Sequence, residues 1–332
     1  MRPPLIITSM HRSGSSTITG LLQAAGLHIG TRLMQANPWN TRGYFENLAF
    51  YDFHRAALAA MRQNPNGYCL TSFNQLPEPW LSQARELLKQ EGQDIPWGWK
   101  DPRSVLFLNF WRELCPGAGY IFLFRNPWCV VDSLYRRGDA VFKNQPELVL
   151  ACWAYYNRKI LEFYRTLPDR CLLAKAEWVF ANPADFIAAV SGKLGIPLDE
   201  VEHTVIDPGL YHDEAELSFY AHMLKEHVPE AVALYQELLC TSDYALLGRT
   251  REEADNAIPL PVPGELKMHF FQDWCEKREL QRNYDALIAT AADNKPGLAG
   301  EDGTLTMMNE YGRELDNLLS DLKCNTEPPP GR

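Results

Sequence analysis

The chain opens with the stretch LIITSMHRSGSST, residues 5–17, and this stretch decides the fold. Its first four residues are apolar or β-branched, which is typical of a strand buried on both faces. A polar turn with one glycine follows, and apolar residues then recur with helical spacing until Gly26 ends the helix. A strand, a turn of small residues and a helix in this order present backbone N–H groups to an anion. The stretch therefore predicts an α/β protein with an anion site at its first turn.

The same alternation continues through the first two-thirds of the chain. Short apolar runs predict further strands over residues 97–99, 120–124 and 171–174. Helical patterns predict helices over residues 47–61, 79–92, 105–114, 126–137, 145–164 and 182–195. We expect residues 1–205 to form a three-layer, P-loop-like α/β domain with a parallel sheet of four to five strands.

The rest of the chain has a different pattern, because no strand signal follows Pro208. Residues 206–327 are expected to form a helical C-terminal region, and residues 328–332 a disordered tail. In the last expected helix, residues 308–322, apolar positions alternate three and four apart over two heptads. A homodimer contact and docking onto the same chain are both consistent with this short seam.

The charge distribution argues against a nucleic-acid binder. The net charge of −10 divides into +2 over residues 1–212 (21 basic, 19 acidic) and −12 over residues 213–332 (11 basic, 23 acidic). Neither part offers the broad basic face that nucleic acid requires. Any bound anion must therefore be held by a few well-placed cations in the first two-thirds of the chain.

The cysteines and the hydropathy favour a cytoplasmic protein. The eight cysteines are scattered without a Cys-x-x-Cys pair, which favours buried free thiols over disulfides or a metal site. The first ten residues lack the apolar core of a signal peptide, and no apolar run approaches the ~20 residues of a membrane span. We expect a cytoplasmic location and no membrane span.

The first candidate anion site combines Arg12 with residues 13–17, namely Ser13, Gly14, Ser15, Ser16 and Thr17. It differs from a Walker A motif because Ser15 stands where the phosphate-binding lysine would follow the glycine. No acidic residue ends a strand where a Mg²⁺-holding carboxylate is needed. The arginine, the small residues and the hydroxyls still make a compact anion cradle, and a tight turn without a ligand is the alternative.

The second candidate anion site lies after the strand over residues 120–124. Arg125 follows this strand at its carboxyl end, where ligands bind in open α/β sheets. Ser133 lies in the next helix, and Arg137 shares its face four residues further on. A solvent-exposed cation at the helix end is the alternative for Arg137.

These two sites together resemble the sulfotransferase family that uses 3′-phosphoadenosine 5′-phosphosulfate (PAPS). The family's 5′-phosphosulfate loop, a Lys or Arg followed by Ser-Gly and two hydroxyl residues, is matched by residues 12–16. Its 3′-phosphate element, an arginine at a strand end with a serine eight residues on, is matched by Arg125 and Ser133. Residues 98–103 resemble the Lys-Asp-Pro turn of bacterial and Golgi members, and Glu177 lies in a segment similar to another family motif. The resemblance implies transfer of a sulfuryl group from PAPS, with PAP as the product and no metal.

The resemblance also implies catalytic roles. Lys100 is expected to stabilise charge on the bridging oxygen, together with Arg12, and Glu46 to act as the general base. An ion pair with the neighbouring aspartate is the alternative for Lys100, and compensation of a helix dipole the alternative for Glu46. His11 is a rival base inside the sulfate loop, and His54 is a third candidate.

The acceptor stays open at this stage. A hydroxyl of a small molecule, carbohydrate or lipid is compatible with the motifs. The aromatic residues around Glu46 would form either an acceptor wall or part of the core. Two other functions are compatible with the same residues. One is a P-loop nucleoside or small-molecule kinase, and the other is a catalytically inactive sulfotransferase fold that serves as a binding module.

Overall fold

The computed structural model describes residues 1–36, 43–201, 218–250 and 270–293. The chain forms two compact units, one of residues 1–130 and 150–259 and the other of residues 131–149 and 260–332. Within the described ranges, no helix is both long and apolar enough to cross a membrane. The helix expected over residues 308–322, its dimer contact and the tail lie outside the described residues. The expected boundary at residue 205 stays a prediction.

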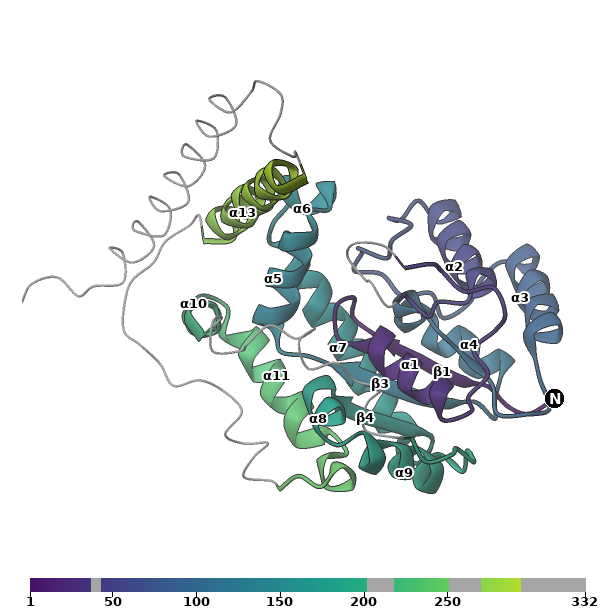
Figure 1. Cartoon of the computed structure of the whole chain (residues 1–332). Helices are drawn as coiled ribbons and strands as arrows, with labels where there is room; N and C mark the ends of the chain where they lie inside the picture. Colours follow the sequence, from purple (N-terminus) through teal and green to yellow (C-terminus); the bar gives the residue numbers. More distant parts are fainter. Residues whose placement is uncertain (37–42, 202–217, 251–269, 294–332) are drawn as a thin grey trace, which may run out of the picture. The chain divides into compact units, whose positions relative to one another are not determined.

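A four-stranded parallel sheet forms the centre of the first unit (Figure 1). Its strands are β1 (Leu5–Ser9), β2 (Gly98–Lys100), β3 (Gly119–Phe124) and β4 (Cys171–Lys175), in the order β2-β1-β3-β4. All pairs of neighbouring strands are parallel. The strands are almost wholly buried, which explains why they read as continuous apolar runs in the sequence. The expected α/β class and strand number are confirmed.

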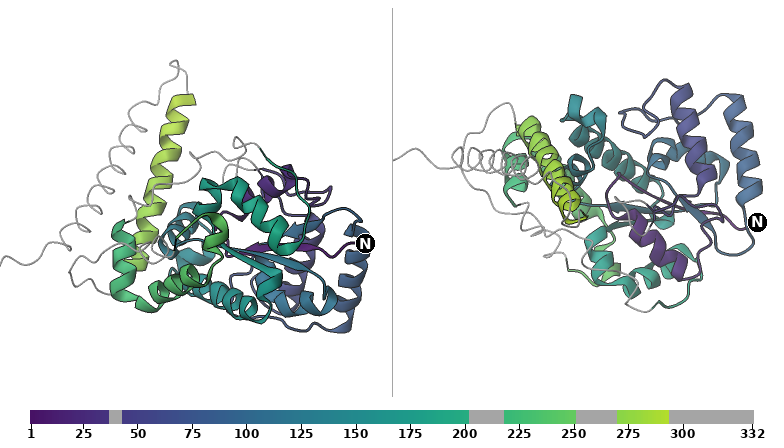
Figure 2. Two further views of the ribbon diagram at one scale, coloured as in Figure 1. Left: turned by 90° about the horizontal axis from the view of Figure 1, so that it is seen from below. Right: turned by 45° about the horizontal axis from the view of Figure 1, so that its top comes forward.

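Helices cover both faces of this sheet (Figures 1 and 2). The helices of the first unit are α1 (Ser15–Ala24), α2 (Leu48–Ala60), α3 (Glu78–Glu91), α4 (Leu108–Leu114), most of α7 (Leu148–Thr166), α8 (Ala176–Ala181), α9 (Pro183–Leu194), α10 (Ser218–His227) and α11 (Pro229–Thr241). Trp99 and Tyr120, which pair with the same β1 residue, Ile6, share one face of the sheet. On that face Trp99 contacts rings of α2 and α4, and Tyr120 contacts a ring of α7. Helices α1 and α9 lie on the opposite face, so the unit has three layers.

An aromatic cluster fixes α2 and α4 against the sheet. The ring of Phe50 stacks on Trp99 at a centroid distance of 4.0 Å, and Trp111 meets Trp99 edge-on at 5.0 Å. All three side chains are buried. Large buried aromatic rings dominate the packing energy of a core, so this cluster holds the start of α2 close to the end of β2.

The order of the strands puts a reversal of the chain connections at the carboxyl ends of β1 and β3. These strands are neighbours, yet β1 leads into α1 on one face while β3 leads toward α7 on the other. In open α/β sheets, ligands commonly bind next to such a reversal. Arg12 lies in the loop after β1, and Arg125 directly follows β3.

The second unit contains three described helical segments. They are the end of α5 (Pro127–Arg137), α6 (Ala140–Asn144) and α13 (Phe270–Asp293). The buried carboxylate of Asp132 in α5 accepts hydrogen bonds from Trp274 Nε1 at 3.0 Å and Arg278 Nε at 2.6 Å, both from α13. These contacts join α13 to α5 within the unit.

Most predicted elements are present within a few residues of their expected ends, but one region differs. A single helix was expected over residues 105–114, whereas the chain forms a 3₁₀ helix, η1 (Pro102–Phe107), followed by α4. Asp101 starts η1 because its side chain accepts a hydrogen bond from Arg103 N at 2.8 Å, and Pro102 supplies a suitable first helical residue. Helices α6 and α8 were not expected from the sequence.

Candidate functional site

The loop between β1 and α1 presents a helix N-terminus without a side-chain cap. Gly14 occupies the N-cap position with φ 80°, in the left-handed region, and it has no side chain to satisfy the N–H groups of the first turn. A Cβ at Gly14 would lie 2.7 Å from the ring of Phe180, so only glycine fits here. Arg12 has φ 66°, which few residues other than glycine adopt. This loop therefore has the geometry expected of an anion cradle.

Ser13 provides a second sign that the loop is built for a ligand. Its side chain is 1% exposed. Within the described part of the chain, its Oγ atom has no hydrogen-bond partner. A buried hydroxyl without a partner is costly, and an anion oxygen in the loop would satisfy it. The donor set of this loop thus fits a phosphate or sulfate group.

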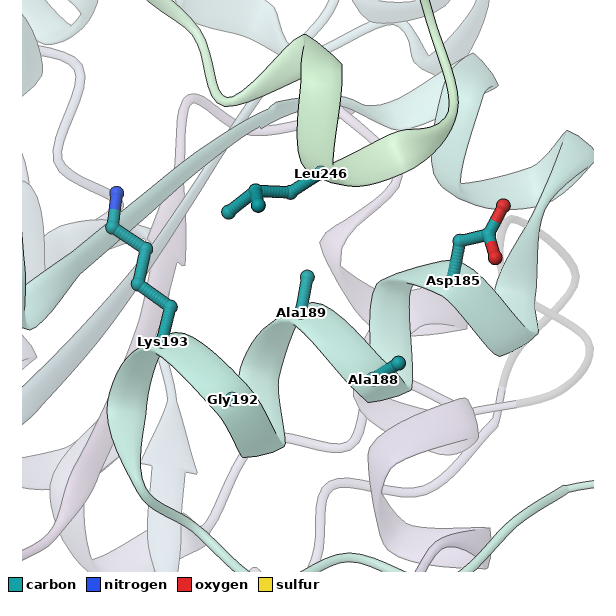
Figure 3. Close-up of a pocket in the computed structure, with 6 residues that line it drawn as sticks. All are labelled: Asp185, Ala188, Ala189, Gly192, Lys193 and Leu246. Atoms are coloured by element: carbon teal, nitrogen blue, oxygen red, sulfur yellow. The ribbon is translucent and has the colours of Figure 1, made fainter.

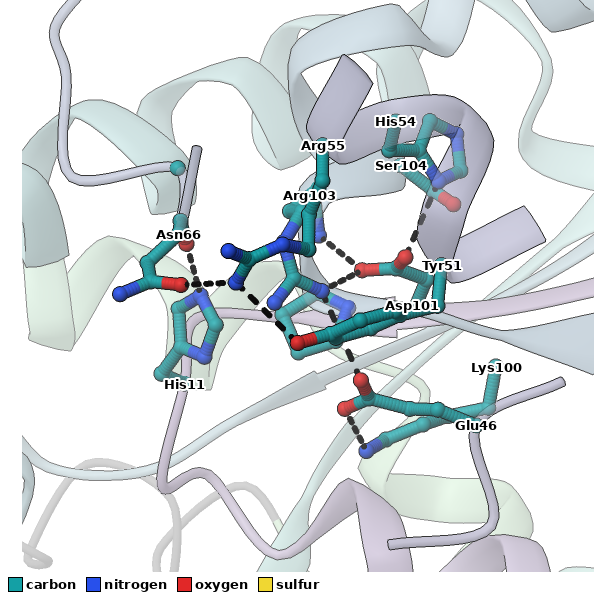
Figure 4. A network of polar contacts seen from close by, with 12 residues as sticks. His11, Glu46, Tyr51, His54, Arg55, Asn66, Lys100, Asp101, Arg103 and Ser104 are labelled. Atoms are coloured by element: carbon teal, nitrogen blue, oxygen red, sulfur yellow. Dashed lines mark hydrogen bonds and ion pairs between the residues drawn. The ribbon is translucent and has the colours of Figure 1, made fainter. Parts of the chain in front are cut away.

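Lys100 joins this loop to Glu46. Its Nζ atom donates to Ser16 Oγ at 3.2 Å, to the Tyr44 carbonyl at 3.0 Å and to Glu46 Oε1 at 2.8 Å. Lys100 is the last residue of β2 and is only 2% exposed. A buried ammonium needs such partners, because an uncompensated buried charge is very unfavourable. Figure 4 shows the Lys100–Glu46 pair within a larger polar network.

The turn before α2 places Glu46 next to Lys100. Phe45 has φ 53°, and its ring packs against α1 where Gly20 leaves space, since a Cβ there would lie 2.9 Å from the ring. Asn47 caps α2, and its side chain accepts a hydrogen bond from Ala49 N at 2.9 Å. The cap of α2 is therefore Asn47, while the Glu46 carboxylate contacts Lys100 and lies 3.5 Å from Arg103.

Asp101 pairs with Arg103 rather than with Lys100. Its Oδ1 atom lies 2.7 Å from Arg103 Nη1, and its Oδ2 atom lies 3.0 Å from His54 Nδ1. Burial alone would raise the pKa of Asp101, but the charge of Arg103 and the hydrogen bonds from Arg103 and His54 hold it well below its usual range. Asp101 is thus a buried carboxylate that stays ionised. The ion pair expected between Lys100 and Asp101 as an alternative is not formed.

His54 has both ring nitrogens engaged within this network. Its Nδ1 atom contacts Asp101, and its Nε2 atom accepts a hydrogen bond from Trp111 Nε1 at 2.9 Å. Because an indole N–H only donates, Nε2 carries the lone pair and the proton lies on Nδ1. His54 is completely buried. It is therefore poorly placed to act as a general base.

His11 lies close to aromatic residues of the first unit. Its Nε2 atom contacts the Asn66 carbonyl at 2.8 Å, so this nitrogen carries the proton and donates. The ring lies 5.2 Å from that of Tyr68 and is 8% exposed. His11 stays a rival candidate for the base.

The second candidate anion site begins at the carboxyl end of β3. Arg125 Nε donates to Glu177 Oε1 at 2.8 Å, and Glu177 lies in the first turn of α8. The carbonyl of Arg125 accepts a hydrogen bond from Trp153 Nε1 at 3.0 Å. Lys175, the last residue of β4, lies opposite Phe124 of β3 in the sheet register and is also buried. Two buried cations, Arg125 and Lys175, thus lie at the carboxyl ends of the neighbouring strands β3 and β4.

The remaining predicted residues lie in the second unit. Ser133 is buried in α5, and Arg137 in the last turn of α5 donates from Nε to Asp139 Oδ2 at 2.8 Å. Of the predicted site residues, the structure brings together Ser16, Lys100 and Glu46.

The sequence pattern missed the position of Arg103 between the carboxylates of Glu46 and Asp101. Arg103 belongs to the quoted Lys-Asp-Pro-Arg turn, but the pattern gives it no function of its own. Its position between two carboxylates depends on Glu46, which is 57 residues away in the chain. The only local signal is an arginine two residues after an aspartate that caps a short helix.

A pocket of about 560 Å³ lies elsewhere in the first unit (Figure 3). It is lined by residues of α9 and by Leu246 of the 3₁₀ turn Tyr244–Leu247, namely Asp185, Ala188, Ala189, Gly192, Lys193 and Leu246. None of the predicted site residues lines it. The pocket therefore adds nothing to the candidate site.

One family model and several solved structures match this chain. A model described as the sulfotransferase family matches residues 3–200, more than half of the chain. The sulfotransferase domain from the curacin biosynthetic pathway is 18% identical, with 85% of this chain and 98% of that chain covered and a TM-score of 0.40. The sulfotransferase domain of the Synechococcus PCC 7002 olefin synthase is 19% identical, with coverage of 83% and 95% and a TM-score of 0.37. A sulfotransferase from Mycobacterium tuberculosis H37Rv is 14% identical, with coverage of 78% and 77% and a TM-score of 0.38. The comparison with curated proteins gave no match.

Proposed function

Because this chain belongs to the sulfotransferase family, we propose that it transfers a sulfuryl group from PAPS to an alcohol and releases PAP. One observation carries the proposal. The ammonium of Lys100 contacts both a hydroxyl of the anion cradle, Ser16 Oγ, and a buried carboxylate, Glu46. A cation and a base are thus held together at the N-terminus of α1, where the sulfuryl end of the donor would lie.

The donor would be held at both of its charged ends. Arg12 with the hydroxyls and backbone of Ser13, Gly14, Ser15, Ser16 and Thr17 would bind the 5′-phosphosulfate. The Ser13 hydroxyl, which is buried and has no hydrogen-bond partner among the described residues, supports this assignment. Arg125 is proposed to bind the 3′-phosphate, which distinguishes PAPS from ATP, while the parts of Ser133 and Arg137 stay predictions from the sequence motif. The position of Arg125 at the carboxyl end of β3 supports its part in this site.

The chemistry follows from the placement of Lys100 and Glu46. The acceptor oxygen attacks the sulfur in line with the bridging oxygen, the new S–O bond forms, and the old S–O bond breaks. The bridging oxygen gains negative charge, which Lys100 stabilises together with Arg12. The proton of the acceptor hydroxyl passes to the Glu46 carboxylate. This route requires no metal ion.

The acceptor is proposed to be a hydroxyl of a small molecule, carbohydrate or lipid. A screen with labelled PAPS and a metabolite extract, read out by mass spectrometry, would identify the class. A sulfated product formed only with the intact enzyme is the expected result.

Binding of the product PAP tests the proposed donor directly. PAP without metal should stabilise the protein by about 2.7 kcal/mol at a hundredfold excess over its Kd, because it binds the native state only. ATP or ADP with Mg²⁺ should stabilise much less, since neither carries a 3′-phosphate. Equal stabilisation by ATP and PAP would argue for a kinase instead.

A further inference from the structure

The Glu46 carboxylate is held from both of its oxygens. Oε1 lies 2.8 Å from Lys100 Nζ, and Oε2 lies 3.5 Å from Arg103 Nη1. We propose that Arg103 is a positioning residue, which keeps the Glu46 carboxylate oriented toward the acceptor during sulfuryl transfer. This inference rests on the proposed function, in which Glu46 is the base.

The Glu46 carboxylate needs a second cationic partner, because Lys100 must also contact the bridging oxygen of the donor. In the ligand-free chain its Nζ atom has three acceptors, Ser16 Oγ, the Tyr44 carbonyl and Glu46 Oε1. An ammonium has three N–H donors, so contact with the bridging oxygen requires that one of these bonds is given up. If the bond to Glu46 is exchanged, Arg103 is the cation that still faces this carboxylate. Arg103 therefore retains the Glu46 side chain when Lys100 turns to the donor.

Arg103 is itself fixed by contacts around its guanidinium group. Nη1 contacts Asp101 Oδ1 at 2.7 Å, and Nε donates to the Pro65 carbonyl at 3.1 Å. The guanidinium carbon lies 4.6 Å from the centre of the Tyr51 ring, a cation–π contact. The side chain is 5% exposed. Such a group has little freedom to move, which is what positioning requires.

A series of buried hydrogen bonds leads from Arg103 through Asp101 to His54 (Figure 4). Asp101 Oδ2 accepts from His54 Nδ1 at 3.0 Å, and His54 Nε2 accepts from Trp111 Nε1 at 2.9 Å. Trp111 belongs to the aromatic cluster that anchors α2 and α4 on the sheet. The orientation of Arg103 is thus tied to the rigid core through Asp101 and His54.

The charges of this network are better explained by function than by stability. It contains two cations, Lys100 and Arg103, and two carboxylates, Glu46 and Asp101, all buried. Buried ion pairs are weak evidence for stability, because apolar residues of similar volume often serve a core as well or better. Charged groups gathered in a buried cluster at the carboxyl end of a sheet strand mark a functional site instead.

A double-mutant cycle tests whether Arg103 acts through Glu46. The measured quantity is the rate of PAP release from saturating PAPS with the metabolite extract as acceptor. Arg103→Gln should lower this rate about 10- to 100-fold in the wild-type background, because a small misplacement of a catalytic group costs about this much. In the Glu46→Gln background the same change should lower the rate less than twofold, because no base is left to position. Arg103→Lys, which keeps the buried charge, should give an intermediate loss.

The control is Lys193→Gln, which makes the same kind of change in an ion pair of the same unit, with Asp243. It should lower the melting temperature and leave the rate unchanged. PAP-induced stabilisation should be the same for all variants of Arg103, since this residue is not proposed to bind the donor.

Each result supports or overturns the inference. Equal losses from Arg103→Gln in both backgrounds would show a general structural role and overturn it, as would full rates for Arg103→Gln and Arg103→Lys. A full rate for Glu46→Gln would overturn it together with the role of Glu46. If wild-type protein neither binds PAP nor turns over PAPS, the proposed function itself falls, and this inference with it.

Discussion

Lys100 Nζ lies 2.8 Å from Glu46 Oε1, and both side chains are buried at the N-terminal end of α1. The two residues are 54 positions apart in the sequence and come from the end of β2 and the turn before α2. The pair unites the cation and the carboxylate to which the proposed sulfuryl transfer assigns catalytic roles. Removal of either partner leaves the other charge buried and less well compensated, so these positions are sensitive for both stability and activity.

The first prediction concerns the base. Glu46→Gln keeps the shape of the side chain but loses its basicity, so kcat should fall about 10²- to 10⁴-fold. PAP-induced stabilisation should stay close to that of the wild type, because Glu46 is not proposed to bind the donor. Steady-state kinetics and thermal shift measure the two quantities.

His11→Asn is the control for this prediction, because His11 is the rival base. Turnover of Glu46→Gln within tenfold of the wild type, together with an inactive His11→Asn, would transfer the role to His11. Retained turnover in both variants would exclude either residue as an essential base.

The second prediction concerns the 3′-phosphate. Arg125→Ala should abolish the difference between stabilisation by PAP and by ADP, because the cation proposed to face the 3′-phosphate is lost. The measurement is the shift in melting temperature with each nucleotide. Arg165→Ala is the control, since Arg165 pairs with Glu237 on the exposed surface and should change neither shift. A retained preference for PAP in Arg125→Ala would move the 3′-phosphate site elsewhere.

The third prediction concerns the pH dependence of stability. The pKa of Asp101 is lower in the folded protein than its unfolded value of about 3.9, because Arg103 and His54 outweigh the effect of burial. A depressed carboxyl pKa contributes stability above the unfolded value, and this contribution is lost as the pH falls through the folded pKa. Urea unfolding between pH 7 and pH 3 should therefore show falling stability at the acid end.

Asp101→Asn isolates this contribution. The variant should lose about 3–5 kcal/mol at pH 7, since it leaves the buried Arg103 without its closest carboxylate. Its stability should also depend less on pH below about 4, because the titrating group is gone. An Asp101→Asn variant with the acid slope of the wild type would show that other carboxyl groups determine the slope.

The fourth prediction concerns the thiols. Cys115, Cys152 and Cys171 are buried thiols, and burial raises the pKa of each to about 12. Cys240 is exposed. Because the thiolate is the reactive form, iodoacetamide at pH 8 should label Cys240 quickly and these three only after unfolding. Peptide mass spectrometry measures the labelling, and rapid labelling of Cys152 in the native protein would contradict its burial.

The sequence by itself determined three strands of the sheet and the loop before α1. The apolar runs that became β1, β3 and β4 are recognisable because strands buried on both faces require continuous hydrophobic residues. The loop before α1 is recognisable because a cradle for an anion would need small residues and a glycine directly before a helix, and these are local requirements. Lys100 and Glu46 were found as single residues, by their resemblance to family motifs.

Only the tertiary structure decided which residues are partners. Lys100 could pair with the adjacent Asp101 as far as the sequence shows, yet it pairs with Glu46, while Asp101 pairs with Arg103 and His54. These choices depend on the packing of α2 against β2 and α4, which brings distant segments within hydrogen-bond distance. The partner of a buried charge is selected by three-dimensional proximity and the need for compensation, and sequence spacing encodes neither.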